Sequence, residues 1–484
     1  MLHEKDMKPL NELTIIEANE LLASGETTSK KITQACLDQI KGMNDMLNAF
    51  VEVYEKDALE AADKADSRRA DGQVLGPLDG IPLAIKDNMM LQGKACTAGS
   101  KILFGHVAAY DSTIVRKLLD QGAVVLGRTN MDEFAMGSST ERSAYGPTKH
   151  PRDPERVPGG SSGGSAAAVL SNMCIAALGS DTGGSIRQPA SLCGIVGLKP
   201  TYGRVSRYGL IAMASSLDQI GPMTKSVDDA ALLLSMLQGQ DPNDQTTSDE
   251  QPFVQSFQAS LKGVRVGLPK QAWSAGLEDR VKENTKAAVE LMREAGAEVK
   301  EIDLPYMDEG LAVYYLLMPC EVSANLARFD GMRYGLRKTS LPLFETYAQS
   351  RAEGFGAEAK RRVLLGAFAL SSGYIDAYYL QAKKVQSLIR KAYEDAFNEV
   401  DLIVTPTTPT TAFKLGEKME DPLAMYLEDV FTVSVNVAGL PAVSIPCETD
   451  GGMPVGFQLI APWFKENTLL SAAKELENLI KQQN

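Results

Sequence analysis

Residues 158–169 read PGGSSGGSAAAV, a glycine- and serine-rich loop that leads directly into an alanine run. The pattern predicts a flexible loop followed by a short helix at about 165–172, whose free N-terminal N–H groups favour negative charge. The lysine of a P-loop and the GxGxxG spacing of a dinucleotide site are both missing. The GxSxG is no hydrolase nucleophile elbow, because no strand directly precedes it. Taken alone, the segment is also typical of a surface linker.

A second glycine turn follows at residues 181–185, DTGGS. Between the two turns lie the short helix and a predicted strand at about 174–178. If helix and strand pack antiparallel, Ser161 and Ser185 end at the same edge of the sheet, where open α/β folds place their sites. The two glycines before Ser185 also allow consecutive backbone N–H groups to converge on one point, as an oxyanion hole requires.

A serine nucleophile needs a base, and histidine is scarce in this chain. Its three histidines are His3, His106 and His150, so every mechanism that needs a histidine downstream of Ser185 is excluded. Lys86 directly follows the apolar run at 80–85, GIPLAI, which predicts a buried strand. Burial lowers the pKa of a lysine, so Lys86 is the candidate base, although most lysines are solvated surface residues.

The wider chain alternates short apolar runs with helical patterns, which predicts an α/β fold with a largely parallel or mixed sheet flanked by helices. Residues 12–66 are predicted to be helical, and long helices are predicted over 340–400. The polar stretch 239–252, GQDPNDQTTSDEQP, is the clearest loop. From these patterns it either divides two domains or decorates one continuous sheet. The predicted strands lie at 81–85, 123–126, 174–178, 264–267, 298–302, 402–404, 442–445 and 455–460.

Composition excludes several classes of protein. The 484 residues carry 49 Lys plus Arg against 62 Asp plus Glu, a net charge of −13, which argues against a primary nucleic-acid grip. Six scattered cysteines show no metal-ligand spacing and fit a reducing cytoplasm. We expect no metal site, no signal peptide and no membrane span.

Three motifs resemble the amidase signature family in the correct order: IKDN around Lys86, GGSSGGSAAAV around Ser161 and DTGGSIRQPA around Ser185. Members of that family hydrolyse amides with a Ser–Ser–Lys triad. The resemblance implies one α/β domain over residues 1–484 with a central mixed sheet of about eleven strands. It divides into a helical part at about 1–70, a signature core at about 80–200 and the polar loop as a decoration.

Carried over residue by residue, the resemblance makes Ser185 the nucleophile. Ser161, expected in a cis peptide after Gly160, bridges Ser185 to a neutral Lys86. The backbone N–H groups of Thr182, Gly183, Gly184 and Ser185 are the implied oxyanion hole.

Other stretches resemble the glutamine-hydrolysing subunits of tRNA-dependent amidotransferases within that family. They are GRVSRYGLIAMASSLDQIGP (203–222), NLARFDGMRYG (325–335), RRVLLGAFALSSGYIDAYY (361–379) and VNVAGLPAVSIPC (435–447). The implied substrate is glutamine, with Arg362 on its carboxylate, Asp429 on its ammonium group and Tyr314, or alternatively Tyr315, in the pocket.

The same resemblance implies a heterotrimer. A B-type partner subunit binds tRNA, ATP and Mg²⁺ and uses the ammonia to convert Glu-tRNA(Gln) to Gln-tRNA(Gln), and a small C-type subunit completes the complex. No cofactor is expected in this chain. The alternatives are a free-standing amidase that acts on another small amide and a scaffold with an inactive site; the presence of Lys86, Ser161 and Ser185 together disfavours the scaffold.

Overall fold

The computed structural model describes residues 8–254, 259–273, 276–339, 342–447 and 452–483, and its centre is one mixed sheet. The strands run in the order β1-β3-β2-β4-β6-β5-β10-β11-β9-β7-β8. This agrees with the predicted α/β fold and its central sheet of about eleven strands. The strands are β1 Phe50–Val53, β2 Pro82–Lys86, β3 Val124–Thr129, β4 Ala176–Asp181, β5 Val196–Lys199, β6 Gln219–Thr224, β7 Arg265–Pro269, β8 Glu298–Ile302, β9 Leu402–Pro406, β10 Ala442–Pro446 and β11 Gly456–Ile460.

Strand direction divides the sheet into two parallel parts with an antiparallel centre. The strands β3, β2 and β4 are parallel, and so are β9, β7 and β8. Between them β6, β5, β10 and β11 pair antiparallel, and β5 pairs with β10. Because one sheet continues on both sides of the polar loop 239–252, that loop decorates the sheet rather than interrupting it.

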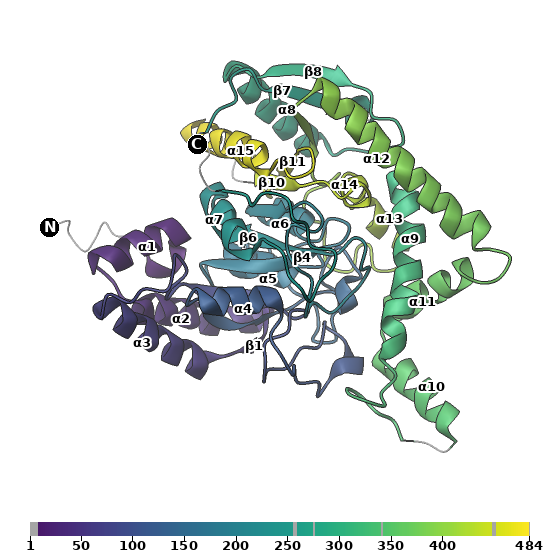
Figure 1. Cartoon of the computed structure of the whole chain (residues 1–484), viewed down its shortest axis with the longest axis horizontal. Coiled ribbons are helices and arrows are strands. Elements are labelled where there is room, and N and C mark those ends of the chain that lie inside the picture. Colours follow the sequence, from purple (N-terminus) through teal and green to yellow (C-terminus); the bar gives the residue numbers. More distant parts are fainter. Residues whose placement is uncertain (1–7, 255–258, 274–275, 340–341, 448–451, 484) are drawn as a thin grey trace.

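Helices surround the sheet (Figure 1). In the view of Figure 1, α1, α2 and α3 lie together at the N-terminal end, while α9 to α12 lie along the opposite side. The helices are α1 Ile15–Ser24, α2 Ser29–Leu47, α3 Glu55–Ala70, α4 Thr113–Asp120, α5 Gly163–Leu170, α6 Arg187–Cys193, α7 Val227–Leu237, α8 Asp279–Glu294, α9 Gly310–Asn325, α10 Leu343–Gly354, α11 Ala357–Ala369, α12 Gln381–Glu399, α13 Pro422–Leu427, α14 Val433–Ala438 and α15 Glu466–Gln483. No helix in the described ranges is long and apolar enough to cross a membrane.

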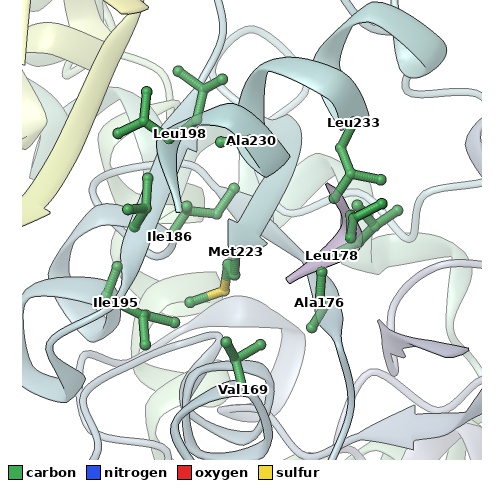
Figure 2. Packing of buried hydrophobic residues seen from close by; sticks show 14 of the residues in the cluster. Val169, Ala176, Leu178, Ile186, Ile195, Leu198, Met223, Ala230 and Leu233 are labelled. Carbon is green, nitrogen blue, oxygen red and sulfur yellow. The ribbon is translucent and has the colours of Figure 1, made fainter. Parts of the chain in front are cut away.

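The core around the signature segment packs small and branched side chains on both faces of the sheet (Figure 2). Val169 of α5 approaches the strands from one side, and Leu233 of α7 approaches from the other. Ala176 of β4 and Met223 of β6 lie between them, fully buried or nearly so. The alanine run therefore forms a thin helix that can lie close against the sheet, and it holds the preceding serine loop at the sheet edge.

Several element boundaries differ from the predictions. The helix α5 begins two residues earlier than predicted, at Gly163, and β4 extends to Asp181 instead of ending at residue 178. The strands β1, β5 and β6 were not predicted. The predicted helices over 340–400 form three helices with a π-helical turn at Asp376–Leu380. Residues 1–7, with His3, and residues 340–341 lie outside the described residues.

The polar loop is confirmed as a loop, and it is anchored to the segment that follows β5. Asp241 accepts a hydrogen bond from Ser206 Oγ at 2.6 Å, and Asp244 accepts one from the Arg207 N–H at 2.8 Å. These bonds satisfy two half-buried carboxylates that its sequence alone leaves without partners.

Candidate active site

Lys86 is the last residue of β2 and is completely buried. Its Nζ lies 2.8 Å from Ser161 Oγ, 2.8 Å from Ser162 Oγ and 2.9 Å from Ser180 Oγ. Burial lowers the pKa of Lys86 to about 7, against the opposing effect of nearby carboxylates. A substantial fraction of the amine is therefore neutral at physiological pH, as a base requires.

The serine loop holds Ser161 against Lys86. The peptide bond between Gly160 and Ser161 is cis, as the family resemblance implied. The Gly160 N–H donates to Gln188 Oε1 at 2.9 Å, and Ser161 O accepts from the Asp132 N–H at 3.4 Å. These contacts hold the backbone of the loop on both sides of Ser161, whose hydroxyl is directed at the lysine.

Ser185 follows β4 in the turn that β4 and β2 place at one edge of the sheet. The two strands are parallel and adjacent, so Lys86 and the turn 181–185 leave the sheet at the same edge, as predicted. Ser185 is 8% exposed, and its carbonyl accepts from the Ser162 N–H at 3.2 Å. Its Oγ makes no hydrogen bond within the described ranges, including none to Ser161. The nucleophile candidate is thus next to the lysine site with a hydroxyl that is free to meet a substrate.

The predicted oxyanion hole needs one correction. The Gly184 N–H donates to Asp181 Oδ1 at 2.9 Å, so it is not available to a substrate oxygen. The N–H groups of Thr182, Gly183 and Ser185 make no hydrogen bond to the described part of the chain. Gly184, at φ +137°, is needed for the turn itself rather than as a donor.

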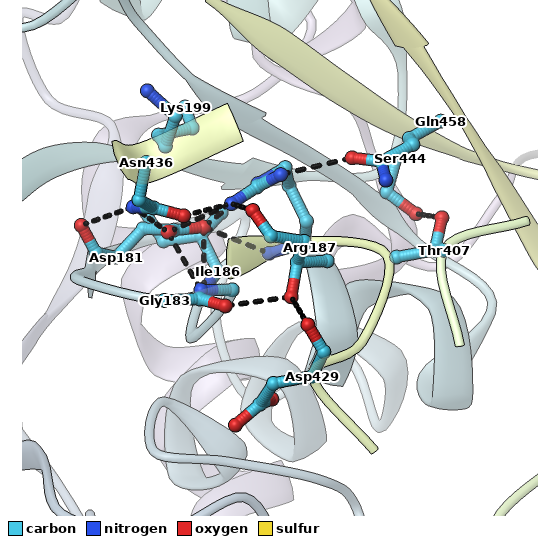
Figure 3. A network of polar contacts seen from close by, with 12 residues as sticks. Asp181, Gly183, Ile186, Arg187, Lys199, Thr407, Asp429, Asn436, Ser444 and Gln458 are labelled. Atoms are coloured by element: carbon cyan, nitrogen blue, oxygen red, sulfur yellow. Dashed lines mark hydrogen bonds and ion pairs between the residues drawn. The ribbon is translucent and has the colours of Figure 1, made fainter. Parts of the chain in front are cut away.

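A buried ion pair supports this turn from below (Figure 3). Arg187 Nε lies 3.0 Å from Asp181 Oδ2, and both side chains are fully buried. Arg187 also donates to Gln458 Oε1 at 2.8 Å and to Asn436 Oδ1 at 2.6 Å. Although burial alone would raise it, the pKa of Asp181 is lowered to about 2 by the guanidinium. Arg187 lies in the quoted motif, but its partners at 436 and 458 could not be foreseen.

Thr432 links the turn to the predicted substrate residue Asp429. Its Oγ1 lies 2.6 Å from Gly183 O and 3.1 Å from Asp429 O, and Figure 3 shows Gly183 and Asp429 on either side of this contact. The side chain of Asp429 accepts from Ser138 Oγ at 2.7 Å. Burial raises the pKa of Asp429 to about 8, so a cation that binds there would be paired with a carboxyl group that is otherwise mostly protonated at neutral pH.

Arg362 is buried, but it already has a partner. Its Nε donates to Glu358 Oε1 at 2.8 Å, one helical turn earlier on α11. The guanidinium lies over the rings of Tyr315 and Tyr426, with 5.3 and 5.5 Å to the ring centroids. Glu358 and the two rings orient the guanidinium without using every N–H of its fork.

Both tyrosines on α9 belong to this region. Tyr314 is buried with its ring against Gly183, because a Cβ at Gly183 would lie 2.6 Å from Tyr314 Cζ. Tyr315 OH lies 3.5 Å from Asp429 Oδ2. Tyr314 therefore contacts the oxyanion turn, while Tyr315 contacts the carboxylate.

The two described histidines lie outside this cluster. His150 is buried and its Nε2 contacts Leu192 O at 2.9 Å, and burial lowers its pKa to about 4. His106 is half-buried beside Tyr334, with ring centroids 5.2 Å apart. Within the described ranges, no three His, Cys, Asp or Glu side chains come together as a metal-binding group.

Comparisons with known proteins agree with this geometry. The sequence profile of the family described as Amidase matches residues 31–470. The A subunits of the glutamyl-tRNA(Gln) amidotransferases of Moorella thermoacetica and Carboxydothermus hydrogenoformans are 51% and 52% identical to this chain, with 96% of each chain covered.

Solved structures match over the same length. The crystal structure of the glutamyl-tRNA(Gln) amidotransferase A subunit from Thermotoga maritima has a TM-score of 0.82 at 42% identity, covering 98% of this chain and 96% of that one. A peptide amidase from Stenotrophomonas maltophilia has a TM-score of 0.83 at 30% identity, covering 98% of both chains. With a family profile over most of its length and relatives at half identity, the chain belongs to the amidase family and is an enzyme.

Proposed function

We propose that this chain hydrolyses the side-chain amide of glutamine and supplies the ammonia to a partner subunit that forms Gln-tRNA(Gln). The observation that carries the proposal is the buried Lys86 at 2.8 Å from Ser161, beside the free hydroxyl of Ser185. A base with a pKa near 7, a bridging hydroxyl and an unpaired nucleophile are the groups that acyl transfer from an amide needs. The names of the closely related proteins support glutamine as the amide donor.

In this mechanism the neutral amine of Lys86 receives a proton through Ser161 while Ser185 Oγ attacks the amide carbon. The hydroxyl of Ser185 turns toward Ser161 when the substrate binds. The N–H groups of Thr182, Gly183 and Ser185 stabilise the negative oxygen that forms. The proton returns to the leaving nitrogen, the C–N bond breaks and ammonia leaves. Water then hydrolyses the ester on Ser185, with the same groups acting as its base.

Recognition of glutamine requires one cation and one anion in the pocket. Arg362 offers the N–H groups that Glu358 leaves unused to the substrate carboxylate. Asp429, held by Ser138, binds the ammonium group. Tyr314 packs against Gly183 and forms the wall between the two ends of the substrate.

We further propose that the whole chain acts as one catalytic domain in a cytoplasmic heterotrimer. A B-type subunit would bind ATP, Mg²⁺ and the misacylated Glu-tRNA(Gln), and a small C-type subunit would complete the assembly. This chain itself would hold no metal or cofactor. Two observations support this division of labour: its relatives are each named as one subunit of an amidotransferase, and its net charge of −13 contrasts with the concentrated positive surface that a tRNA grip needs.

The decisive experiment measures ammonia release from glutamine with and without the partner subunits, ATP and Glu-tRNA(Gln). We expect Ser185→Ala to abolish release while the circular dichroism spectrum and melting temperature stay unchanged. Persistent turnover by Ser185→Ala would refute the mechanism.

A free-standing amidase is the second candidate, and the 30%-identical peptide amidase favours it. Full activity of the chain alone on peptide amides, with no gain from the partner subunits, would establish that alternative.

A further inference from the structure

Asn88 lies two residues after Lys86 and is connected to it through a single hydroxyl. Its side chain is buried, and its backbone carbonyl accepts from the Ile211 N–H at 2.8 Å. Asn88 Nδ2 donates to Ser180 Oγ at 2.9 Å, and Ser180 Oγ lies 2.9 Å from Lys86 Nζ. The three side chains therefore form a line from an amide, through a hydroxyl, to the amine.

Hydrogen-bond counting shows that the two protonation states of Lys86 need different partners. The ammonium form has three N–H donors, and the hydroxyls of Ser161, Ser162 and Ser180 supply three acceptors. The neutral amine has two N–H donors and one lone pair. In the neutral state one of the three hydroxyls must therefore turn and donate to Nζ.

The direction of the Ser162 hydroxyl is set by its surroundings. Its Oγ lies 3.2 Å from Ser180 O, which accepts its proton, and it receives the Ser180 N–H at 3.3 Å. Ser162 therefore faces Lys86 as an acceptor. Ser161 is the hydroxyl that carries the proton in the proposed mechanism. Ser180 remains as the hydroxyl whose direction is decided elsewhere.

Asn88 decides it. While Nδ2 donates to Ser180 Oγ, the proton of Ser180 has Lys86 Nζ as its acceptor, and this favours the neutral amine. If the amide turned over, Oδ1 would accept the proton of Ser180, which could then accept from an ammonium group. Asn88 Oδ1 is buried and has no hydrogen-bond partner within the described ranges, so the amide holds an unused acceptor for this second state.

We propose that Asn88 is a positioning residue that acts through Ser180 to favour the neutral form of Lys86, and that its amide turns over when Lys86 takes up a proton. The proposal rests on the role of Lys86 as base in the proposed function. The charged groups that face Lys86 are Asp132, Asp181 and Asp218, and all three favour the ammonium form. The amide thus opposes their field without adding a charge of its own.

The test replaces the amide by an apolar group of similar size, Asn88→Leu. Ser180 is then no longer steered toward the lone pair, so the ammonium form becomes more favourable. We expect the pKa of Lys86 to rise by about one unit, a tenfold change in the protonation constant. The readouts are the titration of the Lys86 Cε resonance by NMR and the acidic limb of kcat/KM against pH, both of which should move to higher pH.

The control removes the hydroxyl. On a Ser180→Ala background, Asn88→Leu should no longer shift the Lys86 titration, whereas Ser180→Thr should retain the original sensitivity to Asn88→Leu. A shift that persists without the Ser180 hydroxyl, or an unshifted titration in folded Asn88→Leu, overturns the proposal. If Asn88→Leu does not fold, Asn88→Asp replaces it, because its carboxylate only accepts; its shift must likewise shrink in Ser180→Ala.

The two readouts also separate this inference from the proposed function. If the chain hydrolyses no amide, the NMR titration still decides whether Asn88 controls Lys86. If glutamine hydrolysis is intact and the Lys86 titration ignores Asn88, only the present inference fails.

Discussion

Replacing Asp429 by asparagine tests the recognition of the substrate ammonium group. Asp429 is buried and accepts one hydrogen bond from Ser138, so Asp429→Asn keeps the shape and removes only the charge. A hydrogen bond between charged groups contributes about 1.5–3 kcal/mol, and about 1.4 kcal/mol corresponds to a factor of ten. We therefore expect kcat/KM for glutamine to fall about 10- to 150-fold.

The assay compares glutamine with glutaramate, which is glutamine without its amino group. Glutaramate keeps the carboxylate and the amide, so Asp429→Asn should change its kcat/KM by less than about twofold. Equal losses on both substrates would show that the substitution damages the site in general, and the assignment of Asp429 would be refuted.

The pH dependence sharpens this prediction. Burial raises the pKa of Asp429 to about 8, so the unliganded carboxyl is mostly protonated at pH 7 and ionises as the pH rises through 8. Only the ionised form pairs with an ammonium group. The ratio of kcat/KM for glutamine to that for glutaramate should therefore rise between pH 7 and 8.5 in the original protein and stay flat in Asp429→Asn. Using the ratio removes the titration of the base, which affects both substrates.

Two further predictions concern the supports of the site. Arg187→Leu leaves the buried carboxylate of Asp181 without its partner and should lower the free energy of unfolding by about 3–5 kcal/mol in chemical denaturation. The control Arg265→Leu, in an exposed ion pair, should lose clearly less, and similar losses would contradict the argument. Gly183→Ala places a Cβ 2.6 Å from Tyr314 Cζ and should lower kcat about 100-fold by displacing an oxyanion donor, with the melting temperature nearly unchanged. An unchanged kcat would exclude Gly183 from the oxyanion hole.

The lysine and both serines could be predicted because each lies inside a compact motif with its own local signal. Lys86 follows an apolar run, and Ser161 and Ser185 lie in glycine turns that one helix and one strand connect. The structure brings Lys86 and Ser161 into contact as expected. The free hydroxyl of Ser185 could not be predicted, because it depends on side-chain directions that spacing does not determine.

Other features lacked a local signal. The strand β6, QIGPMT, contains a glycine and a proline that normally argue against a strand, and β5 has only four residues. The partners of Arg187 lie about 250 residues further along the chain. By contrast, the pairing of Arg362 with Glu358 was readable in principle, since residues four apart on a helix face each other.

The order of the strands also has a consequence for synthesis on the ribosome. The last two strands to emerge, β10 and β11, are inserted in the middle of the sheet between β5 and β9. Until residues 442–460 have left the ribosome, the nascent chain therefore carries two incomplete sheets, each with an uncovered edge that can pair with other chains. Chains that end prematurely before residue 442 should consequently aggregate rather than form a smaller active enzyme.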